Sequence, residues 1–361
     1  MAAAVLLRAL LVSRLLREVS FRAVEALVGS PARQGMGVRR SFGDDALSYL
    51  TERLDAGRLR TTVATVVRQA KRNKAFDENR WIGLALDGTG AGRSREKKCA
   101  WCRPVRNGKK EVVGYGHRLV MVSVLGTTLS LPLDVEPYGP GDSEYSGGQR
   151  LLRRAVKALG VRFADYVVVD GEFATAPFLH TAGNLGLKVV ARLKGNLPEL
   201  FQAAQQRFAG RPPAQIFRHG SDRVEIWDGD DFDPWENLRW ETVRVIYYRQ
   251  HKPDGTLVEA YWLTDFSRKQ AGSQAIFGMA KNRWQIENQG FNDAKNRYGF
   301  EHICHHHQNS LLIHWLITVL TLTLERLYRL RHLHRGNHPV LEPIALLRLL
   351  RLSLLEPADT S

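Results

Sequence analysis

The chain has 361 residues, of which 44% are hydrophobic and 25% charged, a composition typical of globular proteins and unlike that of disordered chains. Lys and Arg outnumber Asp and Glu by 52 to 37, and the formal net charge of +15 favours a polyanionic partner, without separating DNA from RNA or an anionic membrane. Three cysteines are too few for a disulfide scaffold and indicate a reducing compartment.

Residues 1–80 are predicted to be helical, with the clearest periodicity in "DALSYLTERLDAG" and "RTTVATVVRQAKRN". The basic residues on their polar faces suit a DNA-contacting module and equally suit solvated helix faces. The Arg-rich start has no acidic residue before Glu18. It fits either an organelle transit peptide or an amphipathic helix of the folded protein, and the general basic bias of the chain favours the helix.

A mixed α/β pattern begins near residue 81. The apolar run "WIGLALD" predicts a strand ending at Asp87, and two further strands separated at Gly126-Thr127 predict an antiparallel hairpin. A helix with Ser143 as its N-cap follows, then the strand "FADYVVVD" ending at Asp170, another helix, and the strand "LKVVARLKGN". Three strands followed by alternating helices and strands predict a mixed sheet with parallel crossovers.

Residues 212–266 interrupt this pattern and are predicted to form a β-rich insertion, with a hairpin at Asp254-Gly255. Helix resumes near Gly272. The apolar run from Leu311 to Leu324 is too short for a membrane span, which needs about 20 residues, and predicts a buried core helix. The expected regions are a helical N-terminal region, the first part of an α/β core, the β-rich insertion, a core helix and a helical C-terminal region, over residues 1–80, 81–211, 212–266, 267–310 and 311–361.

Two aspartates, Asp87 and Asp170, lie at the carboxyl ends of predicted strands, where open α/β sheets place their ligand sites. Converging carboxylates repel each other unless cations neutralise them, and oxygen ligands favour Mg²⁺ or Mn²⁺. Glu287, on a later helix, is the best candidate for the third carboxylate of a site holding two ions about 3.5–4 Å apart. A turn aspartate or a surface glutamate is the ordinary alternative for each residue alone. Their coincidence favours a metal site.

The motifs "LALDGTG", "VVVDGEFATAPF", "YWLTDF" and "RWQIENQGFNDAKNRYGFEH" resemble those of the DDE transposases of bacterial insertion sequences, over roughly residues 80–310. The resemblance implies an RNase H-like mixed sheet flanked by helices, with a β-rich subdomain inserted before the glutamate helix. It implies that Asp87, Asp170 and Glu287 bind two Mg²⁺ or Mn²⁺ ions. It also implies cleavage at the inverted terminal repeats of an element and strand transfer into target DNA, by a homodimer in the bacterial cytoplasm without a membrane partner.

In many of these transposases the glutamate helix carries a Tyr-Arg-Glu-Lys signature whose basic members hold DNA phosphates. Arg283 and Glu287 match it, but Ala280 stands at the tyrosine position and Lys295 follows Glu287 by eight residues instead of seven. On a regular α-helix, eight residues put Lys295 about 80° around from the glutamate. Either a local bulge restores the register, or Lys295 reaches DNA from the flank, or Arg297 replaces it.

"CAWC" has the spacing of half a zinc site, and "HICHHH" offers the other half. The predicted ligands of a structural zinc ion are Cys99, Cys102, Cys304 and His305. Unliganded thiols, and histidines that contact DNA or cap the next helix, are the alternative.

Tryptophans of the predicted insertion are candidates for DNA contact. The family resemblance implies that an aromatic residue there stacks on a base displaced from the duplex. Trp235, Trp240 and Trp262 are the candidates, and the sequence does not choose among them. Core packing is the alternative for each.

Two rival functions remain at this stage. One is a nuclease on the same core that hydrolyses DNA without strand transfer. The other is a catalytically silent DNA-binding protein derived from a transposase, which the three acidic residues disfavour.

Overall fold

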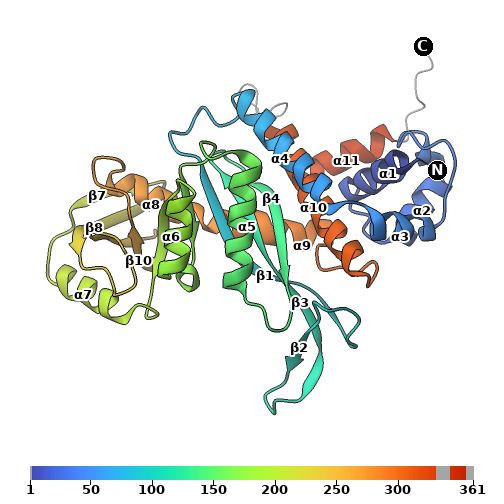
Figure 1. The fold of residues 1–361 in the computed structure, drawn as a ribbon. Coiled ribbons are helices and arrows are strands. Elements are labelled where there is room, and N and C mark those ends of the chain that lie inside the picture. Colours follow the sequence, from blue (N-terminus) through green and yellow to red (C-terminus); the bar gives the residue numbers. More distant parts are fainter. Residues whose placement is uncertain (1, 331–341, 355–361) are drawn as a thin grey trace.

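The computed structural model describes residues 2–330 and 342–354 as a long mixed β-sheet with helices packed on both faces and a helical region beyond one end (Figure 1). The helices are α1 (Ala3–Leu15), α2 (Phe21–Gly29), α3 (Asp44–Arg53), α4 (Ala56–Arg72), α5 (Glu144–Leu159), α6 (Ala176–Asn184), α7 (Pro198–Phe208), α8 (Ser273–Asn282), a π-helix (Ile286–Phe291), α9 (Asn292–Tyr298), α10 (Gln308–Tyr328) and α11 (Pro343–Ser353). The strands are β1 (Gly83–Ser94), β2 (Arg103–Arg106), β3 (Val112–Leu125), β4 (Leu131–Tyr138), β5 (Tyr166–Val169), β6 (Lys188–Leu193), β7 (Gln215–His219), β8 (Asp222–Phe232), β9 (Val243–His251) and β10 (Leu257–Thr264).

The central strands have the order β4-β3-β1-β5-β6. β1, β3 and β4 pair antiparallel, whereas β5 is parallel to both β1 and β6. The turn between β3 and β4 uses Gly126 at a φ of 119°, a conformation that glycine adopts without steric cost. α5 begins at the predicted N-cap, where the Ser143 hydroxyl accepts a hydrogen bond from the Ser146 amide at 3.1 Å. This is the RNase H-like arrangement that the sequence predicts.

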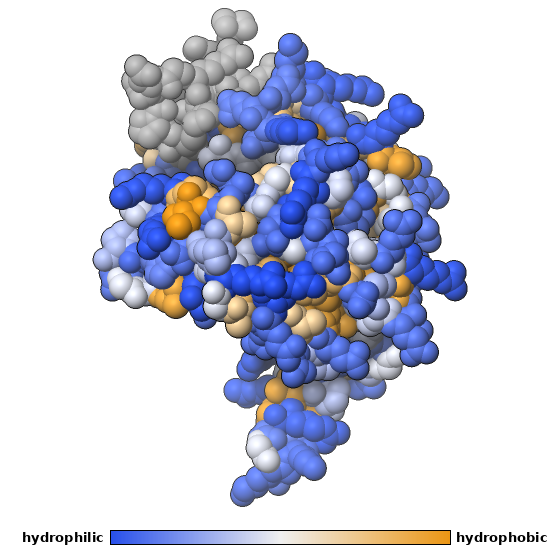
Figure 2. Space-filling model, turned by 90° about the vertical axis from the view of Figure 1, so that its left-hand side faces the viewer, coloured by the Kyte–Doolittle hydropathy of each residue, from blue (hydrophilic) through white to orange (hydrophobic). Residues whose placement is uncertain are grey.

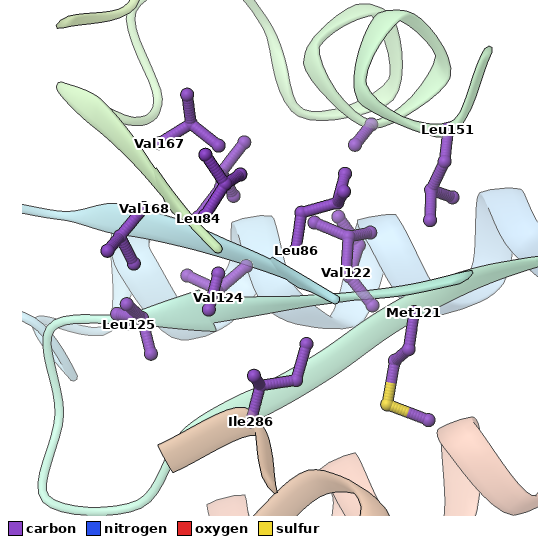
Figure 3. Packing of buried hydrophobic residues seen from close by; sticks show 14 of the residues in the cluster. Leu84, Leu86, Met121, Val122, Val124, Leu125, Leu151, Val167, Val168 and Ile286 are labelled. Carbon is purple, nitrogen blue, oxygen red and sulfur yellow. The ribbon is translucent and has the colours of Figure 1, made fainter. Parts of the chain in front are cut away.

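Both faces of the central strands are buried, which explains their nearly continuous apolar sequences. Leu86 and Val122 point toward Leu151 of α5, while Met121 and Ile286 lie on the opposite side of the sheet (Figure 3). Ile286 is the first residue of the π-helix and is 0% exposed. The hydrophobic core therefore fixes the segment that carries Glu287 against the central strands.

Residues 212–266 form β7, β8, β9 and β10, and Gly255 adopts a φ of 83° at the predicted β9–β10 hairpin. β10 pairs antiparallel with β6, so these strands extend the central sheet at one edge. α7 precedes them and was not predicted. Pairing between β6 and β10 joins segments far apart in the sequence, and no local pattern encodes it.

The helical region packs around α10, which is long and apolar enough to cross a membrane but is 83% buried within the protein. The predicted core helix is thus confirmed. α1 belongs to the fold, since its buried Arg14 donates to the Tyr298 carbonyl at 3.1 Å and lies 2.9 Å from His314 Nδ1. The parts of the predicted C-terminal helical region at residues 331–341 and 355–361 lie outside the described residues.

The outer part of β1, β2 and the first half of β3 form an arm that projects from the body (Figure 1). Figure 2 shows it standing out with a mostly hydrophilic surface. Residues 93–111 contain eight Lys and Arg and two Glu. The arm therefore presents a concentrated positive charge to the solvent.

Candidate active site

Asp87 and Asp170 lie side by side at one edge of the sheet. Leu86 of β1 pairs with Val169 of β5, and each aspartate is the next residue along its strand. Neighbouring strands are about 4.8 Å apart, so the two carboxylates leave the sheet close together. Their side chains are 15% and 24% exposed, respectively. The two acids therefore lie close together, although the predicted strand end at Asp87 is wrong: Asp87 lies within β1, where its pairing with β5 stops, and β1 continues along β3 to Ser94.

The guanidinium of Arg283 brings Glu287 to the same place. Its Nη1 lies 3.1 Å from Asp87 Oδ2 and 2.8 Å from Glu287 Oε1, so these two oxygens are no farther apart than the sum of the two distances. Arg283 is 8% exposed and caps the C-terminus of α8, three residues before the π-helix begins. The guanidinium therefore bridges Glu287, whose side chain is 34% exposed, to Asp87.

The segment between Glu287 and Lys295 contains the π-helix, which inserts one extra residue into a helical turn. This extra residue accounts for the spacing of eight residues, instead of seven, between Glu287 and Lys295. It is the local bulge that the sequence analysis gives as one explanation of that spacing. Lys295 Nζ lies 3.0 Å from Glu301 Oε1, and Arg297 Nη1 lies 3.4 Å from Asp293 Oδ1. Lys295 is therefore paired with an acid in the turn after α9, and Arg297 with an acid of α9 itself, and no described ion pair joins either to Asp87, Asp170 or Glu287.

Arg326 of α10 holds the π-helix in place. Its guanidinium donates to the carbonyls of Gln289 and Ser130 and lies 3.1 Å from Asp293 Oδ2. The Gln289 side chain in turn accepts a hydrogen bond from the Ser130 amide at 2.7 Å. Helical bulges leave carbonyls without helix partners, and buried carbonyls need them. Arg326, 0% exposed, supplies such a partner.

The two aspartates have different electrostatic environments. Burial raises the pKa of Asp87 to about 7, against the opposing effect of Arg283 and with a further rise from Glu287 and Glu144. Burial acts in the same direction on Asp170, but the hydrogen bond from Lys194, 2.7 Å away, leads a set of interactions that lower its pKa overall. Ionisation is therefore unfavourable for Asp87 and favourable for Asp170.

Lys194 and Glu144 are site residues that the sequence analysis missed. Lys194 follows β6, the parallel neighbour of β5, so the rule that located the aspartates also applies to the strand "LKVVARLKGN". Glu144 begins α5 and accepts a hydrogen bond from the Tyr138 hydroxyl at 3.0 Å. Its carboxylate lies so close above Gly88 that no Cβ fits at that position. No spacing rule links this helix start to Asp87.

Trp262 does not fit its predicted role. Its indole is 2% exposed in the core of the sheet extension, with the Arg192 guanidinium 5.6 Å from the ring centre. Stacking on a base requires a solvent-accessible ring, so this assignment is wrong for the structure described. Trp284 is instead 46% exposed and lies next to Arg283, whose guanidinium carbon is 5.1 Å from the ring centre. The sequence feature that indicates Trp284 as a candidate for base stacking is its position directly after Arg283.

The predicted zinc ligand set is also wrong in half of its members. Cys304 Sγ lies 3.6 Å from His314 Nδ1 in the helical region, and His305 Nε2 lies 2.8 Å from Glu52 Oε1. Cys99 and Cys102 gather with a different residue, His117. The segment after α9 turns its Cys304 toward α10, away from the CxxC loop.

A sheet of this strand order, with three acids at its carboxyl edge, defines an RNase H-like class of protein. Residues 82–324 match the sequence profile described as the transposase DDE domain. The match spans more than half of the chain, which therefore belongs to this transposase family.

Among solved structures, the fold is similar to that in a cryo-EM structure of a piggyBac transposase synaptic complex with hairpin DNA. The TM-score is 0.51 at 13% sequence identity, over 98% of this chain and 70% of that chain. A likeness at this identity supports the fold alone. No curated protein is significantly similar in sequence.

Proposed function

We propose that this transposase cleaves DNA at the inverted terminal repeats of its element in a Mg²⁺- or Mn²⁺-dependent reaction and joins the freed 3′-hydroxyls to target DNA. The observation that carries the proposal is the convergence of Asp87, Asp170 and Glu287 on one edge of the sheet, around the cations of Arg283 and Lys194.

The donor set fits hard divalent ions. All three acids offer oxygen ligands, which suit Mg²⁺ or Mn²⁺. Arg283 and Lys194 lie beside the acids, and burial keeps the pKa of Asp87 raised in spite of Arg283, so a bound cation would favour the ionised form of Asp87. Bound ions would polarise the phosphodiester and activate the attacking hydroxyl group. Asp87, between Asp170 and Glu287, is the residue best placed to serve both ions.

The neighbouring residues suit a DNA end. Arg283 and Lys194 offer charge-assisted hydrogen bonds to phosphate oxygens. Trp284 presents an exposed ring beside them, and stacking on an unpaired base contributes about 1–3 kcal/mol. The basic arm and the net charge of +15 supply binding to the DNA backbone on both sides of the site. Two copies of the chain, one for each terminal repeat, would complete the assembly.

The test uses duplexes from the two genomic flanks of the coding region, incubated with the full chain and MgCl₂. Wild type should nick at the ends of inverted repeats, whereas Asp170→Ala should bind the same duplexes with little change and not cut them. The matched control is Asp265→Ala, because Asp265 also lies just past a strand end but interacts with Lys188 and the Val189 amide, outside the site. Unchanged cleavage by Asp170→Ala would remove this residue from the triad.

The same protein separates transposition from its rivals. Pre-cut terminal duplexes supplied with a circular target plasmid should give joined products. Hydrolysis without joined products would indicate a nuclease. Binding without metal-dependent nicking would indicate a silent DNA-binding descendant.

A further inference from the structure

A cluster of two cysteines and a histidine lies at the base of the arm. Among the residues that the structure describes, Cys99, Cys102 and His117 are the one group of three or more His, Cys, Asp or Glu residues whose ligand atoms all lie within 4.8 Å of one another. We propose that these three residues bind a structural Zn²⁺ ion and that His306 completes its tetrahedral shell. This inference does not depend on the DNA chemistry proposed above.

The distances within the group agree with zinc geometry. With Zn–S bonds of about 2.3 Å and Zn–N bonds of about 2.0–2.1 Å, tetrahedral angles place two sulfurs about 3.8 Å apart and a sulfur and a nitrogen about 3.6 Å apart. The two Sγ atoms are 3.6 Å apart, and His117 Nε2 lies 3.1 Å from Cys99 Sγ and 3.6 Å from Cys102 Sγ. An ion fits among these three atoms with small adjustments.

The backbone explains why the three residues meet. β2 and β3 pair antiparallel with Arg103 opposite Gly116, so the preceding Cys102 lies opposite the following His117. The CxxC segment is a tight turn in which the Cys102 amide donates to the Cys99 carbonyl at 3.2 Å.

His117 is buried, and one of its ring nitrogens faces the two cysteine sulfurs, as expected for a metal ligand. The residue is 1% exposed, and its Nε2 faces both sulfurs while its Nδ1 is buried without a hydrogen-bond partner. A zinc ion among these atoms would bind Nε2, the nitrogen that faces the sulfurs, and Nδ1 would then carry the proton of the neutral imidazole. Trp315 of α10 fixes the ring from one side, with the two ring centres 6.0 Å apart.

His306 is the residue placed to close the shell. It lines the same surface cleft as Cys99, and its Nδ1 is buried without a hydrogen-bond partner. It is close enough to His117 to interact with it electrostatically. Its nitrogens lie outside the group whose ligand atoms are within 4.8 Å of one another, so the ring would move inward when the ion binds. His305 is held by Glu52, and His307 is exposed at the start of α10, so neither offers an equivalent position.

A zinc ion at this position would fix the base of the basic arm to the body of the protein. Cys99 and Cys102 belong to the loop between β1 and β2, His117 to β3, and His306 to the segment that follows the glutamate helix. One ion would bind all three segments together. The arm would then keep a fixed direction relative to the body, although its outer half has solvent on most sides (Figure 2).

The first measurement is made on the full wild-type chain, purified in reducing buffer with excess MgCl₂ to occupy the oxygen-ligand site. Mass spectrometry should find about one zinc per chain. Replacement of zinc by cobalt(II) should give the intense visible absorption of a tetrahedral ion and a thiolate-to-cobalt charge-transfer band. A folded wild-type chain with less than about 0.1 zinc, or a Cys99–Cys102 disulfide in its place, would overturn the proposal.

Matched variants identify the ligands. Cys99→Ser and His117→Asn should lose the metal, whereas Cys304→Ser should retain it, because that thiol lies beside His314. His306→Asn should weaken zinc binding by about tenfold or more and alter the cobalt spectrum, since water then replaces one of four ligands. His307→Asn should change neither. Equal metal loss in Cys304→Ser and Cys99→Ser would refute the ligand set, and an unaltered His306→Asn spectrum would refute the fourth ligand.

Discussion

The raised pKa of Asp87 predicts that this acid destabilises the metal-free protein. Its carboxyl titrates near 7 in the folded chain instead of the ordinary 3.8, mainly because it is buried. Between these values the folded state binds more protons than the unfolded state, so the unfolding free energy falls as the pH rises from about 4 to about 7. Because one pKa unit corresponds to about 1.4 kcal/mol, the cost at pH 8 is about 4 kcal/mol.

Asp87→Asn removes this cost and should therefore stabilise the protein at pH 8 while abolishing cleavage. The pKa of about 7 already includes the opposing effect of Arg283, so the loss of that ion pair is not subtracted again and the expected gain at pH 8 is at most about 4 kcal/mol. Relative to wild type, the variant should gain about 3 kcal/mol between pH 5 and pH 8, since only the wild-type carboxyl titrates across that range.

Thermal unfolding at pH 5 and pH 8, without added Mg²⁺, measures the effect as a difference in Tm between variant and wild type. Added Mg²⁺ should raise the Tm of wild type more than that of the variant. Asp170→Asn is the control of opposite sign: its pKa is lowered, so the substitution should cost stability at pH 8, by less than about 1 kcal/mol given the exposed Lys194 partner. A Tm difference for Asp87→Asn that is the same at both pH values would refute the reasoning.

Four further substitutions test the parts around the acids. Arg326→Met should cost about 3–5 kcal/mol in chemical denaturation, because it removes a buried donor from two carbonyls and one of two arginine partners from Asp293. Trp262→Ala should cost about 3–5 kcal/mol as a core truncation. Trp284→Ala should change stability by less than about 0.5 kcal/mol but weaken binding to duplexes with unpaired ends, measured by fluorescence anisotropy. Lys194→Ala should lower the slope of log affinity against log salt by about 1 if the lysine holds a phosphate.

The sequence was sufficient where the relevant pattern is local or follows from strand direction. Asp87 and Asp170 each follow the apolar run of their strand, and parallel pairing of those two runs makes their convergence a geometric consequence, although β1 continues past Asp87 to Ser94. The eight-residue interval between Glu287 and Lys295 also carried information, because a bulge was one of the explanations for it and the chain forms a π-helix there, although Lys295 pairs with Glu301.

The sequence was insufficient where a residue's partner depends on the pairing of distant segments. His117 lies within a strand and has no ligand-spacing signature, and only the β2–β3 register places it opposite Cys102. Cys304 has a favourable motif context, but the packing of α10 directs its thiol elsewhere. Trp262 was judged by residue type and region, while its burial depends on β10 joining the central sheet through β6.

α10 supports both proposed metal sites through different residues, and this separation predicts what each metal controls. Arg326 near its end holds the π-helix that carries Glu287, whereas Trp315 in its middle packs against Trp101 and His117. None of the zinc ligands contributes a hydrogen bond to Arg326 among the described contacts. Loss of zinc should therefore free the basic arm while leaving the three acids gathered. A zinc-free Cys99→Ser protein should keep its Mg²⁺-dependent rise in Tm and lose affinity for long duplexes, whereas loss of both would mean that the arm and the acids form one cooperative unit.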